Sequence, residues 1–438
     1  MSKRIYLVSA LFVVLVLALS ACQPATPTPE PPEETTEVPT PEPVVEPSGD
    51  MEVFSWWTAG GEAEGLNAML EIFAAEYPDV SIINATVAGG AGVDARAVLA
   101  TRMQGGEPPD SFQVHAGHEL IDTYVVANQM EPLTWLYEEE GWLDVMPPDL
   151  IAILSSEGEI WSVPVNIHRA NVLWYNKAVL AANNIQPPTT WEEFFTAADT
   201  LKAAGIVPLS LGESWTQVHL FETVLLGTLG PDAYIGLWNG TTDWDSAEVT
   251  AALENFDRIL DYVNEDFAAL SWDQATQLVI DGTAAMNIMG DWAEGYFKSK
   301  GLTPDVEFGW APSPGSGGSF DALSDSFGLP LGAPNRDAAI AWLKICGSQA
   351  GQDAFNPVKG SIPARTDGDR SLYDVYLQSA MDDFSSNAIV PSLMHGAAVA
   401  PSWQQDTIDA VGLFIANRDV AAFQASLSSA CVAAGLCQ

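Results

Sequence analysis

Apolar and polar positions alternate with two different periods from Met51 onward. Short apolar runs bounded by Gly, Pro or Asp predict strands at residues 51–57, 80–88 and 111–115. Apolar side chains at helical spacing predict helices at residues 61–77, 94–104 and 118–129. Because strands and helices take turns, we expect a doubly wound α/β lobe with parallel strands.

The later part of the chain continues this alternation. At Trp191 a Thr cap precedes a first turn that contains two Glu, which predicts a helix start. Further helices are expected through residue 300, followed by a second β region at residues 307–314 and 324–330 and by terminal helices. The chain contains no internal repeat.

The first 22 residues have the pattern of an export signal. Lys3 and Arg4 precede an apolar run that is long enough for a signal peptide and short for a membrane span. The sequence Leu-Ser-Ala-Cys at residues 19–22 resembles the lipobox of bacterial lipoproteins. The resemblance implies cleavage before Cys22 and lipid attachment to its sulfur; the alternative is a plain signal peptide with an incidental cysteine.

Residues 23–50 are rich in Pro, Glu and Thr and contain no aromatic side chain. Such a segment cannot bury enough surface to fold, so we expect a disordered tether between anchor and folded part. With the lipid, the tether would hold the protein outside the cytoplasm, at the outer face of the cytoplasmic membrane. The residue after the candidate lipidation site is Gln23, which leaves open in which membrane the anchored protein would remain if the host has two.

Composition restricts the partners of the folded part. The chain has 58 acidic against 16 basic residues and a net charge of −42, which argues against nucleic acid and against anionic membrane surfaces. About 390 residues remain after the tether, and this length favours two lobes over one simple domain.

Four cysteines occur. Cys22 is the lipidation candidate, and Cys346 lies in an amphipathic helical pattern that predicts a buried apolar residue. Cys431 and Cys437 are close in sequence near the C-terminus, and outside the cytoplasm they form either a disulfide or two free thiols.

Motifs for chemistry are weak. Residues 90–95 loosely match a dinucleotide fingerprint, but they follow the second strand and not the first, so we expect a turn and no cofactor. His115 and His118 have a spacing that a metal could use, yet no third ligand lies nearby in sequence, and we expect no metal. No Ser lies in a GxSxG elbow, so no catalytic residue is assigned.

Tryptophan is the informative residue type. The chain has 15 Trp, and several stand beside polar residues where strands meet loops: Trp56-Trp57 before Glu62, Glu213-Ser214-Trp215, Ser271-Trp272-Asp273 and Asp291-Trp292. Sugars present apolar C–H faces and a ring of hydroxyls, so aromatic faces with nearby carboxylates are typical of sugar sites.

Several longer blocks resemble a known family. They are EVFSWWTAGGE, NATVAGGAGVDARAVLATRMQGGEPPDSFQVHAG, WSVPVNIHRANVLWYNK, PPTTWEEF, AAMNIMGDWAEGYF, FGWAPSPG, LSDSFGLPLGA, GQDAFNPVKGSIPAR and IVPSLMHGAA. Together they resemble the extracellular solute-binding proteins of bacterial sugar ABC importers, and within these the glucose/mannose receptors. The likeness runs from about residue 51 to about residue 425.

The resemblance implies an α/β, two-lobed periplasmic-binding-protein-like fold of type II, with a hinge and a ligand cleft between two doubly wound lobes. Within the folded part, residues 51–438, the lobes would be discontinuous. The first would comprise about 51–167 and 328–370, and the second about 168–327 and 371–438.

The resemblance also implies sugar contacts, position by position. They come from Trp56, Trp57, Glu62, Gln113, His115, Trp215, Trp272, Asp291, Trp292, Asp325, Lys359 and His395. Relatives have Lys at the position of His115, so hydroxyl contacts there would differ. Asn166 and Arg169 either contact the ligand or only fix the hinge. One of Trp56 and Trp57 faces the sugar and the other packs beneath it, at the end of a parallel strand where ligands bind.

The sequence therefore predicts a lipid-anchored, monomeric receptor that is not an enzyme. It would bind a monosaccharide, glucose first and then mannose or galactose, and deliver it to an ABC permease served by a separate ATPase. Two alternatives stay open. One is a secreted glycosidase with a carboxylate pair; the other is a receptor for another solute, such as an oligosaccharide or a metal.

Overall fold

A five-stranded sheet opens the described part of the chain. The computed structural model describes residues 47–89 and 92–437, so Cys22, the signal segment and most of the tether lie outside the described residues. The first sheet has the order β2-β1-β3-β13-β6. Its strands are β1 (Gly49–Ser55), β2 (Val80–Thr86), β3 (Ser111–His115), β6 (Ser162–Pro164) and β13 (Asp325–Gly328).

The first sheet departs from the sequence prediction in two respects. Strands β1, β2 and β3 are parallel as expected, but β13 runs antiparallel to both β3 and β6, so the sheet is mixed. In addition, β1 begins at Gly49, which pairs with Val80, although residues 49 and 50 were assigned to the tether. The strand is longer because its parallel partner extends to that point.

A four-stranded second sheet has the order β11-β8-β10-β9. Its strands are β8 (Val172–Asn176), β9 (Val207–Ser210), β10 (Ala284–Ile288) and β11 (Phe308–Pro312). Only β10 and β9 pair in parallel; β8 is antiparallel to both of its neighbours.

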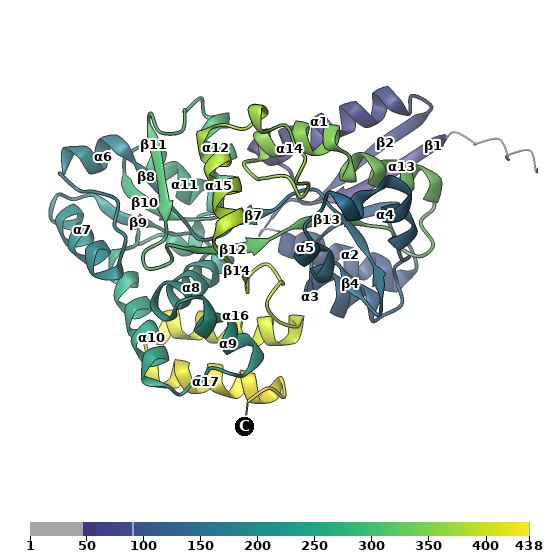
Figure 1. Cartoon of the computed structure of the whole chain (residues 1–438). Helices are drawn as coiled ribbons and strands as arrows, with labels where there is room; N and C mark the ends of the chain where they lie inside the picture. The colour runs from purple at the N-terminus through teal and green to yellow at the C-terminus, as the bar shows by residue number, and fades with distance from the viewer. Residues whose placement is uncertain (1–46, 90–91, 438) are drawn as a thin grey trace, which may run out of the picture. The chain divides into compact units, whose positions relative to one another are not determined.

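A short crossing sheet connects the two. It has the order β14-β12-β7, with β7 (His168–Arg169), β12 (Ser319–Leu323) and β14 (Ala388–Pro391). Strand β7 lies in the chain between β6 and β8, and β12 directly precedes β13, so both crossings leave one large sheet and enter the other. Figure 1 shows β7 and β12 between the two larger sheets. The two lobes of the predicted fold class are therefore present, joined by these crossings.

Helices surround each sheet. Those packed with the first sheet include α1 (Gly60–Glu76), α2 (Val93–Gly105), α13 (Arg336–Gly347) and α14 (Gln349–Lys359). Those packed with the second include α6 (Lys177–Ala182), α7 (Trp191–Ala203), α8 (Ser214–Leu229), α11 (Trp272–Ile280) and α12 (Trp292–Ser299). As predicted, the side chain of Thr190 caps α7 by accepting a hydrogen bond from the Glu193 N–H.

The expected helix at residues 118–129 is shorter and irregular. It consists of α3 (His118–Leu120) and a π-helical turn, η2 (Ile121–Val125), in which the Val126 N–H donates to the Ile121 carbonyl.

The remaining elements complete the surface and the C-terminal region. They are α4 (Thr134–Glu140), η3 (Trp142–Asp144), α5 (Pro148–Ile153), β4 (Ser155–Ser156), β5 (Glu159–Ile160), α9 (Pro231–Asn239), α10 (Ala247–Ile259), η4 (Leu260–Tyr262), η5 (Phe267–Ala269), η6 (Arg370–Leu372), α15 (Val375–Ser386), α16 (Pro401–Asn417) and α17 (Val420–Ala433). Within residues 47–89 and 92–437, no helix combines the length and the apolar character that crossing a bilayer requires.

The two adjacent tryptophans have different roles in packing. Trp57 is 1% exposed, and its ring packs on Phe355 at 4.8 Å and on Phe327 at 5.7 Å between ring centroids. Trp56 instead lies against His115, at 5.1 Å. Both rings are buried, and Trp57 is the more deeply packed of the two, a distinction that the sequence left open.

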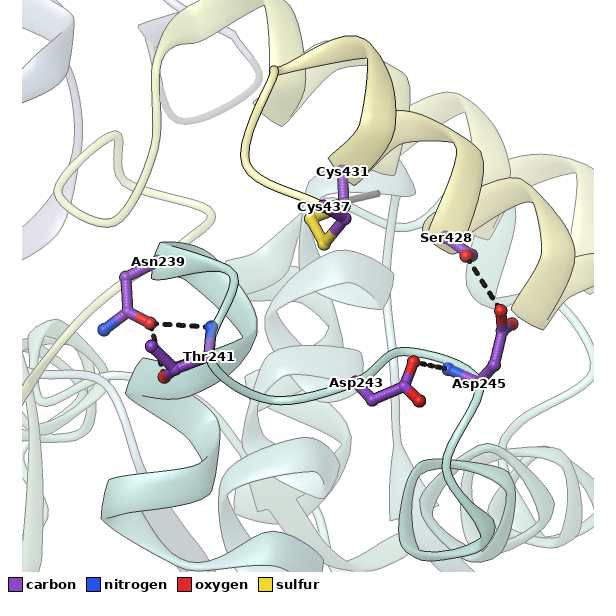
Figure 2. Close-up of a disulfide and its surroundings, with 7 residues drawn as sticks. All are labelled: Asn239, Thr241, Asp243, Asp245, Ser428, Cys431 and Cys437. Atoms are coloured by element: carbon purple, nitrogen blue, oxygen red, sulfur yellow. Dashed lines mark hydrogen bonds between the residues drawn. A yellow bond between two sulfur atoms is a disulfide. The ribbon is translucent and has the colours of Figure 1, made fainter.

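The structure joins Cys431 and Cys437 by a disulfide (Figure 2), which closes the end of α17, while Cys346 is free and buried. A cross-link over a loop this short stabilises a fold by about 2 kcal/mol in the chain-entropy account.

We expect Cys437→Ser to lower the free energy of unfolding by about that amount. Urea unfolding of variant and wild type checks this, and reductant should remove the difference between them. An unchanged urea midpoint without reductant would contradict a stabilising bridge.

Candidate sugar-binding cleft

A cavity of about 160 Å³ lies where the two lobes meet. It is lined by Trp56, Trp57, Thr58, Ala59, Glu62, Gly89, Gly92, His115, His168, Glu213, Trp215, Ser271, Trp272, Asp273, Trp292, Tyr296, Leu323, Asp325, Lys359 and His395. The first lobe contributes the ends of β1 and β3, and the second contributes the first residues of α8, α11 and α12. Ten of the twelve predicted contact residues line this one cavity.

Aromatic rings from both lobes line the cavity. Trp56 and Trp57 belong to the first lobe, while Trp215, Trp272 and Trp292 belong to the second. Trp215 and Trp292 lie 6.1 Å apart between centroids. Flat apolar faces from both lobes suit a ligand that has apolar faces of its own, such as a sugar ring.

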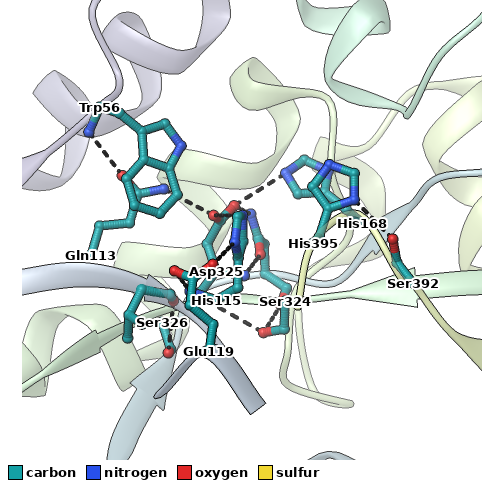
Figure 3. A network of polar contacts seen from close by, with 12 residues as sticks. Trp56, Gln113, His115, Glu119, His168, Ser324, Asp325, Ser326, Ser392 and His395 are labelled. Atoms are coloured by element: carbon teal, nitrogen blue, oxygen red, sulfur yellow. Dashed lines mark hydrogen bonds and ion pairs between the residues drawn. The ribbon is translucent and has the colours of Figure 1, made fainter. Parts of the chain in front are cut away.

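Asp325 lies at the centre of the polar groups, where β13 begins (Figure 3). Its carboxylate accepts hydrogen bonds from Gln113 Nε2 at 2.9 Å and from Asn166 Nδ2 at 2.8 Å. Burial opposes ionisation of this group. His168, whose Nε2 lies 3.4 Å from the carboxylate, outweighs that effect together with His115 and Lys359, and the pKa of Asp325 is held well below its usual range. Asp325 is thus an ionised acceptor facing the cavity.

Gln113 and Asn166 support Asp325 from outside the cavity wall. Gln113 also accepts a hydrogen bond from the Trp56 N–H at 3.2 Å, and the Asn166 side-chain oxygen accepts one from the Asp325 N–H at 2.8 Å. Gln113 was predicted as a direct contact, and in the structure it fixes two residues that line the cavity.

Asp291 is also placed behind the cavity. It is fully buried, and its two oxygens are engaged by the His168 ring and by the Arg169 N–H. The cavity wall at this point is His168, a residue that the sequence prediction passed over although it lies between Asn166 and Arg169. Burial alone would lower the pKa of His168, but the Asp291 charge and hydrogen bond raise it overall.

Arg169 is buried in the crossing sheet and does not line the cavity. Its guanidinium pairs with Asp383 at 2.5 Å and donates to Asn171 at 3.1 Å. Of the two roles considered for Arg169, the structure provides the contacts for fixing the crossing.

Lys359 closes the cavity from the end of α14. Its Nζ is 2.8 Å from Glu62 and lies over the rings of Trp57 and Trp292, at 5.8 and 5.9 Å. The ammonium therefore contacts an aromatic wall of each lobe. An ammonium has three N–H donors, so the pairing with Glu62 leaves donors of Lys359 unused.

His115 is held from behind by Glu119, with Nδ1 2.8 Å from the carboxylate (Figure 3). Burial alone would raise the pKa of Glu119, but the charges of His115 and Arg96 lower it overall. His118, the other histidine of the predicted metal spacing, is half-exposed and bonds Asp122. The two rings thus have different carboxylate partners.

A different group of possible metal ligands appears in the structure. His219 and Glu222 on α8 and His395 after β14 each place a ligand atom within 4.8 Å of the others, and all three are buried. Glu222 already accepts hydrogen bonds from Ser392 Oγ and from the N–H groups of Leu393 and Met394. Hydrogen bonds thus occupy the Glu222 carboxylate in this arrangement.

Several cavity residues were not in the predicted set. Glu213, Asp273 and Tyr296 line the wall of the second lobe. Glu213 and Asp273 are each within two residues of a predicted tryptophan, so the Trp-acid pairing in the sequence was the signal that could have identified them. Tyr296, one turn beyond Trp292 on α12, had no such signal.

Three fully buried carboxyl groups have raised pKa values because burial disfavours their charge. Glu222 is raised to about 7, and Glu294 and Asp321 are raised well above their usual range. A carboxyl group whose pKa is higher in the folded than in the unfolded state stabilises the fold at low pH. This stabilisation is fully present below the unfolded pKa, about 4, and it is lost as the pH rises through the folded pKa.

From Glu222 alone we expect the free energy of unfolding to increase as the pH falls from 8 to 5.5, by about 2 kcal/mol. The raised pKa of His168 acts in the same direction as Glu222, whereas the pKa values of His219 and His395, which burial lowers, act in the opposite direction. Urea unfolding of the wild type and of Glu222→Gln across this range isolates the Glu222 contribution, because the variant should lack the gain between pH 7 and 5.5. The same pH dependence in Glu222→Gln and in the wild type would contradict the assignment.

Comparison with known proteins agrees with this geometry. The model of bacterial extracellular solute-binding proteins matches residues 49–353. An uncharacterized ABC transporter extracellular-binding protein of Pyrococcus horikoshii is 37% identical over 95% of this chain and 94% of that protein. A probable sugar-binding periplasmic protein of Mesorhizobium japonicum is 34% identical over 84% of this chain and 89% of that protein. The glucose-binding protein GlcS of Saccharolobus solfataricus is 25% identical over 70% of this chain and 59% of that protein.

Among solved structures, the bacterial solute receptor AcbH superposes with a TM-score of 0.77 at 17% identity, covering 89% of this chain and 99% of that chain. That identity is informative for the fold alone. Sequence and fold together show that the chain belongs to the family of bacterial extracellular solute-binding proteins.

Proposed function

We propose that this protein is the substrate-binding receptor of an ABC sugar importer and that its ligand is a monosaccharide, with glucose as the first candidate and mannose or galactose next. The main support for this proposal is the size of the cavity. Its volume is about 160 Å³, below the roughly 300–1,000 Å³ of pockets that hold drug-sized ligands, and tryptophans of both lobes line it. A single sugar ring suits this volume better than an oligosaccharide does.

The polar groups of the cavity support the same ligand class. Asp325 is an ionised acceptor, Lys359 is a paired donor, and the rings of His115, His168 and His395 line the same cavity. Sugar hydroxyls both donate and accept, so a mixed set of charged acceptors and donors around one ring suits them. The ligand leaves as it arrived, with no bond broken. It selects the form in which the lobes are closed, and the permease recognises that form.

The proposed cellular setting follows from the N-terminal segment and the family. Lipid on Cys22 would anchor the chain at the outer face of the cytoplasmic membrane, with residues 23–48 as the tether. A monomeric receptor would then deliver the sugar to permease subunits served by a separate ATPase. Mass spectrometry of the protein extracted from membranes tests the anchor, because a mature chain that begins at Cys22 carries the added mass of the lipid.

The test of ligand class uses the compact unit Glu46–Gln438, unfolded and refolded to remove any bound ligand. D-glucose, D-mannose, D-galactose, maltose and longer glycans are titrated while tryptophan fluorescence and melting temperature are followed. A rise in melting temperature with micromolar glucose but not maltose supports the proposal, because a ligand that binds only the folded state must stabilise it. A response only to longer glycans would assign an oligosaccharide receptor, and turnover of a glycoside would assign a glycosidase.

A further inference from the structure

His395 enters the cavity from a loop that a buried carboxylate holds in place. Glu222 on α8 is fully buried and accepts hydrogen bonds from the N–H groups of Leu393 and Met394, at 2.6 and 3.0 Å. It also accepts a third from Ser392 Oγ, at 3.0 Å. Three donors from consecutive residues thus converge on one carboxylate, which fixes the loop that carries His395.

The same contacts determine where the protons lie. Above the pKa of about 7 to which burial raises Glu222, its ionised carboxylate is an acceptor only, so at such a pH the single hydroxyl proton of Ser392 points to Glu222. The Ser392 oxygen is also 2.8 Å from His395 Nδ1 (Figure 3). Since that oxygen has no second proton to give, Nδ1 must be the donor of this bond, and a neutral His395 then has no proton on Nε2.

The remaining nitrogen belongs to a side chain that lines the cavity. His395 is one of the residues that line the cavity. Its Nε2 is not among the buried nitrogens that lack a hydrogen-bond partner in the described part of the chain. Its ring packs edge-on against Trp292 and His115, at 5.2 and 5.5 Å between centroids, so its orientation is restricted from both lobes.

We propose that Glu222, acting through Ser392, fixes His395 as the tautomer protonated on Nδ1 and thereby makes Nε2 a hydrogen-bond acceptor for one hydroxyl of the bound sugar. This inference rests on the proposed function for its ligand. Glu222 and Ser392 are positioning residues, because they touch His395 and its loop and not the cavity. The Glu222–Ser392–His395 relay therefore selects a sugar that presents a hydroxyl donor at that point of the ring.

His115 is held by a carboxylate in a similar way. Its Nδ1 bonds the Glu119 carboxylate at 2.8 Å, and its Nε2 faces Asp325 at 3.7 Å. In His115 and His395 alike, a carboxylate engages Nδ1 from the side away from the cavity, directly in His115 and through Ser392 in His395. The groups behind the cavity lining thus determine what each ring offers to the ligand.

The decisive measurement is the two-bond ¹H–¹⁵N spectrum of the full chain labelled with ¹⁵N-histidine, recorded at pH 8.5. This pH is above the value of about 7 to which burial raises the pKa of Glu222. The chain has only five histidines, so His395→Gln identifies the signals by their loss. We expect His395 to carry its proton on Nδ1. A His395 ring protonated on Nε2 overturns the proposal whether or not any sugar binds.

Ser392→Ala breaks the relay and leaves the two main-chain hydrogen bonds from the loop to Glu222 in place. We expect the His395 proton to move to Nε2 and the affinity for D-glucose to fall about tenfold. Ser392→Thr keeps the hydroxyl and should restore both. The matched control is Ser326→Ala, which removes a buried hydroxyl that bonds Ser162 and Val114 and no histidine; tautomer and affinity should stay unchanged.

The remaining outcomes separate this inference from the proposed function. If Ser392→Ala moves the proton but binds glucose as tightly as the wild type, the acceptor role of Nε2 is wrong. If no monosaccharide binds the wild type, the proposed function fails, and the spectrum still decides the tautomer. A transition metal bound by His219, Glu222 and His395 would occupy a His395 nitrogen and the Glu222 carboxylate, both of which the relay needs. Stoichiometric zinc in the purified protein would therefore overturn the relay as well.

Discussion

Asp325→Asn is expected to weaken D-glucose binding about a hundredfold, and Asp325→Ala about a thousandfold. The carboxylate receives hydrogen bonds from Gln113 and Asn166 and is the counter-charge that His168, His115 and Lys359 share. An amide places an NH₂ group against donors, and alanine leaves the buried cationic groups without their partner. Isothermal titration with D-glucose measures the loss.

The matched control is Asp321→Asn, four residues earlier on β12. Asp321 is as deeply buried as Asp325, but it does not line the cavity and its carboxyl oxygens have no hydrogen-bond partner in the described part of the chain. Its affinity should change by less than about threefold, since the side chain is outside the binding surface. Equal effects of the two substitutions, or wild-type binding by Asp325→Asn, would remove Asp325 from the site.

Gly295→Ala is expected to weaken sugar binding by about tenfold to a hundredfold by preventing full closure of the lobes. A Cβ on Gly295, in α12, would lie 2.5 Å from the Lys359 carbonyl oxygen and 2.8 Å from that of Val358, both in α14. Main-chain atoms cannot move aside as side chains can. The helices would have to separate, and that would draw Trp292 on α12 away from Lys359.

Gly412 provides the control for Gly295→Ala. Gly412 lies within α16, and a Cβ there meets no atom within 4 Å, so Gly412→Ala should leave glucose binding unchanged. Small-angle scattering of Gly295→Ala with saturating glucose should show a larger radius of gyration than the liganded wild type. A variant that binds glucose normally and closes as far as the wild type would show that the approach of α12 to α14 is not needed for binding.

Much of the cleft follows from local sequence signals. Trp56 and Trp57 end a strand, and Trp215, Trp272 and Trp292 lie at or next to the first residue of helices α8, α11 and α12. Ligands of α/β proteins bind where strands end and helices begin, so these positions could be placed from sequence together with the family resemblance. Asp325 and Lys359 came from the resemblance, and in the structure both line the same cavity as the tryptophans.

The sequence could not distinguish residues that line the cavity from residues that lie behind them. Asp291 is next to Trp292 and has the chemistry of a sugar ligand, yet its oxygens hold His168 and the Arg169 main chain. Glu222 and Ser392 are 170 residues apart, and their contact depends on how β14 and α8 pack. Contacts this distant in sequence leave no periodic trace, so only the assembled fold reveals them.

The fold shows the same division. Alternating strands and helices predicted the first lobe, whereas the mixed direction of its sheet arises because β13 and β6 enter from the crossings. A turn signal can mark where a strand ends, but not which neighbour it pairs with. The residue ranges given to the two lobes remain a prediction, and the crossing sheet β14-β12-β7 is the natural place for their boundary.

The most direct measurement is a crystal structure of the unit Glu46–Gln438, refolded without ligand and then crystallised with D-glucose. We predict one sugar ring in the cavity between Trp56 and the tryptophans of the second lobe, with Asp325, Lys359 and His395 within hydrogen-bond distance of its hydroxyls. A glucose bound elsewhere, or a cavity that stays free of sugar at saturating glucose, would contradict the account.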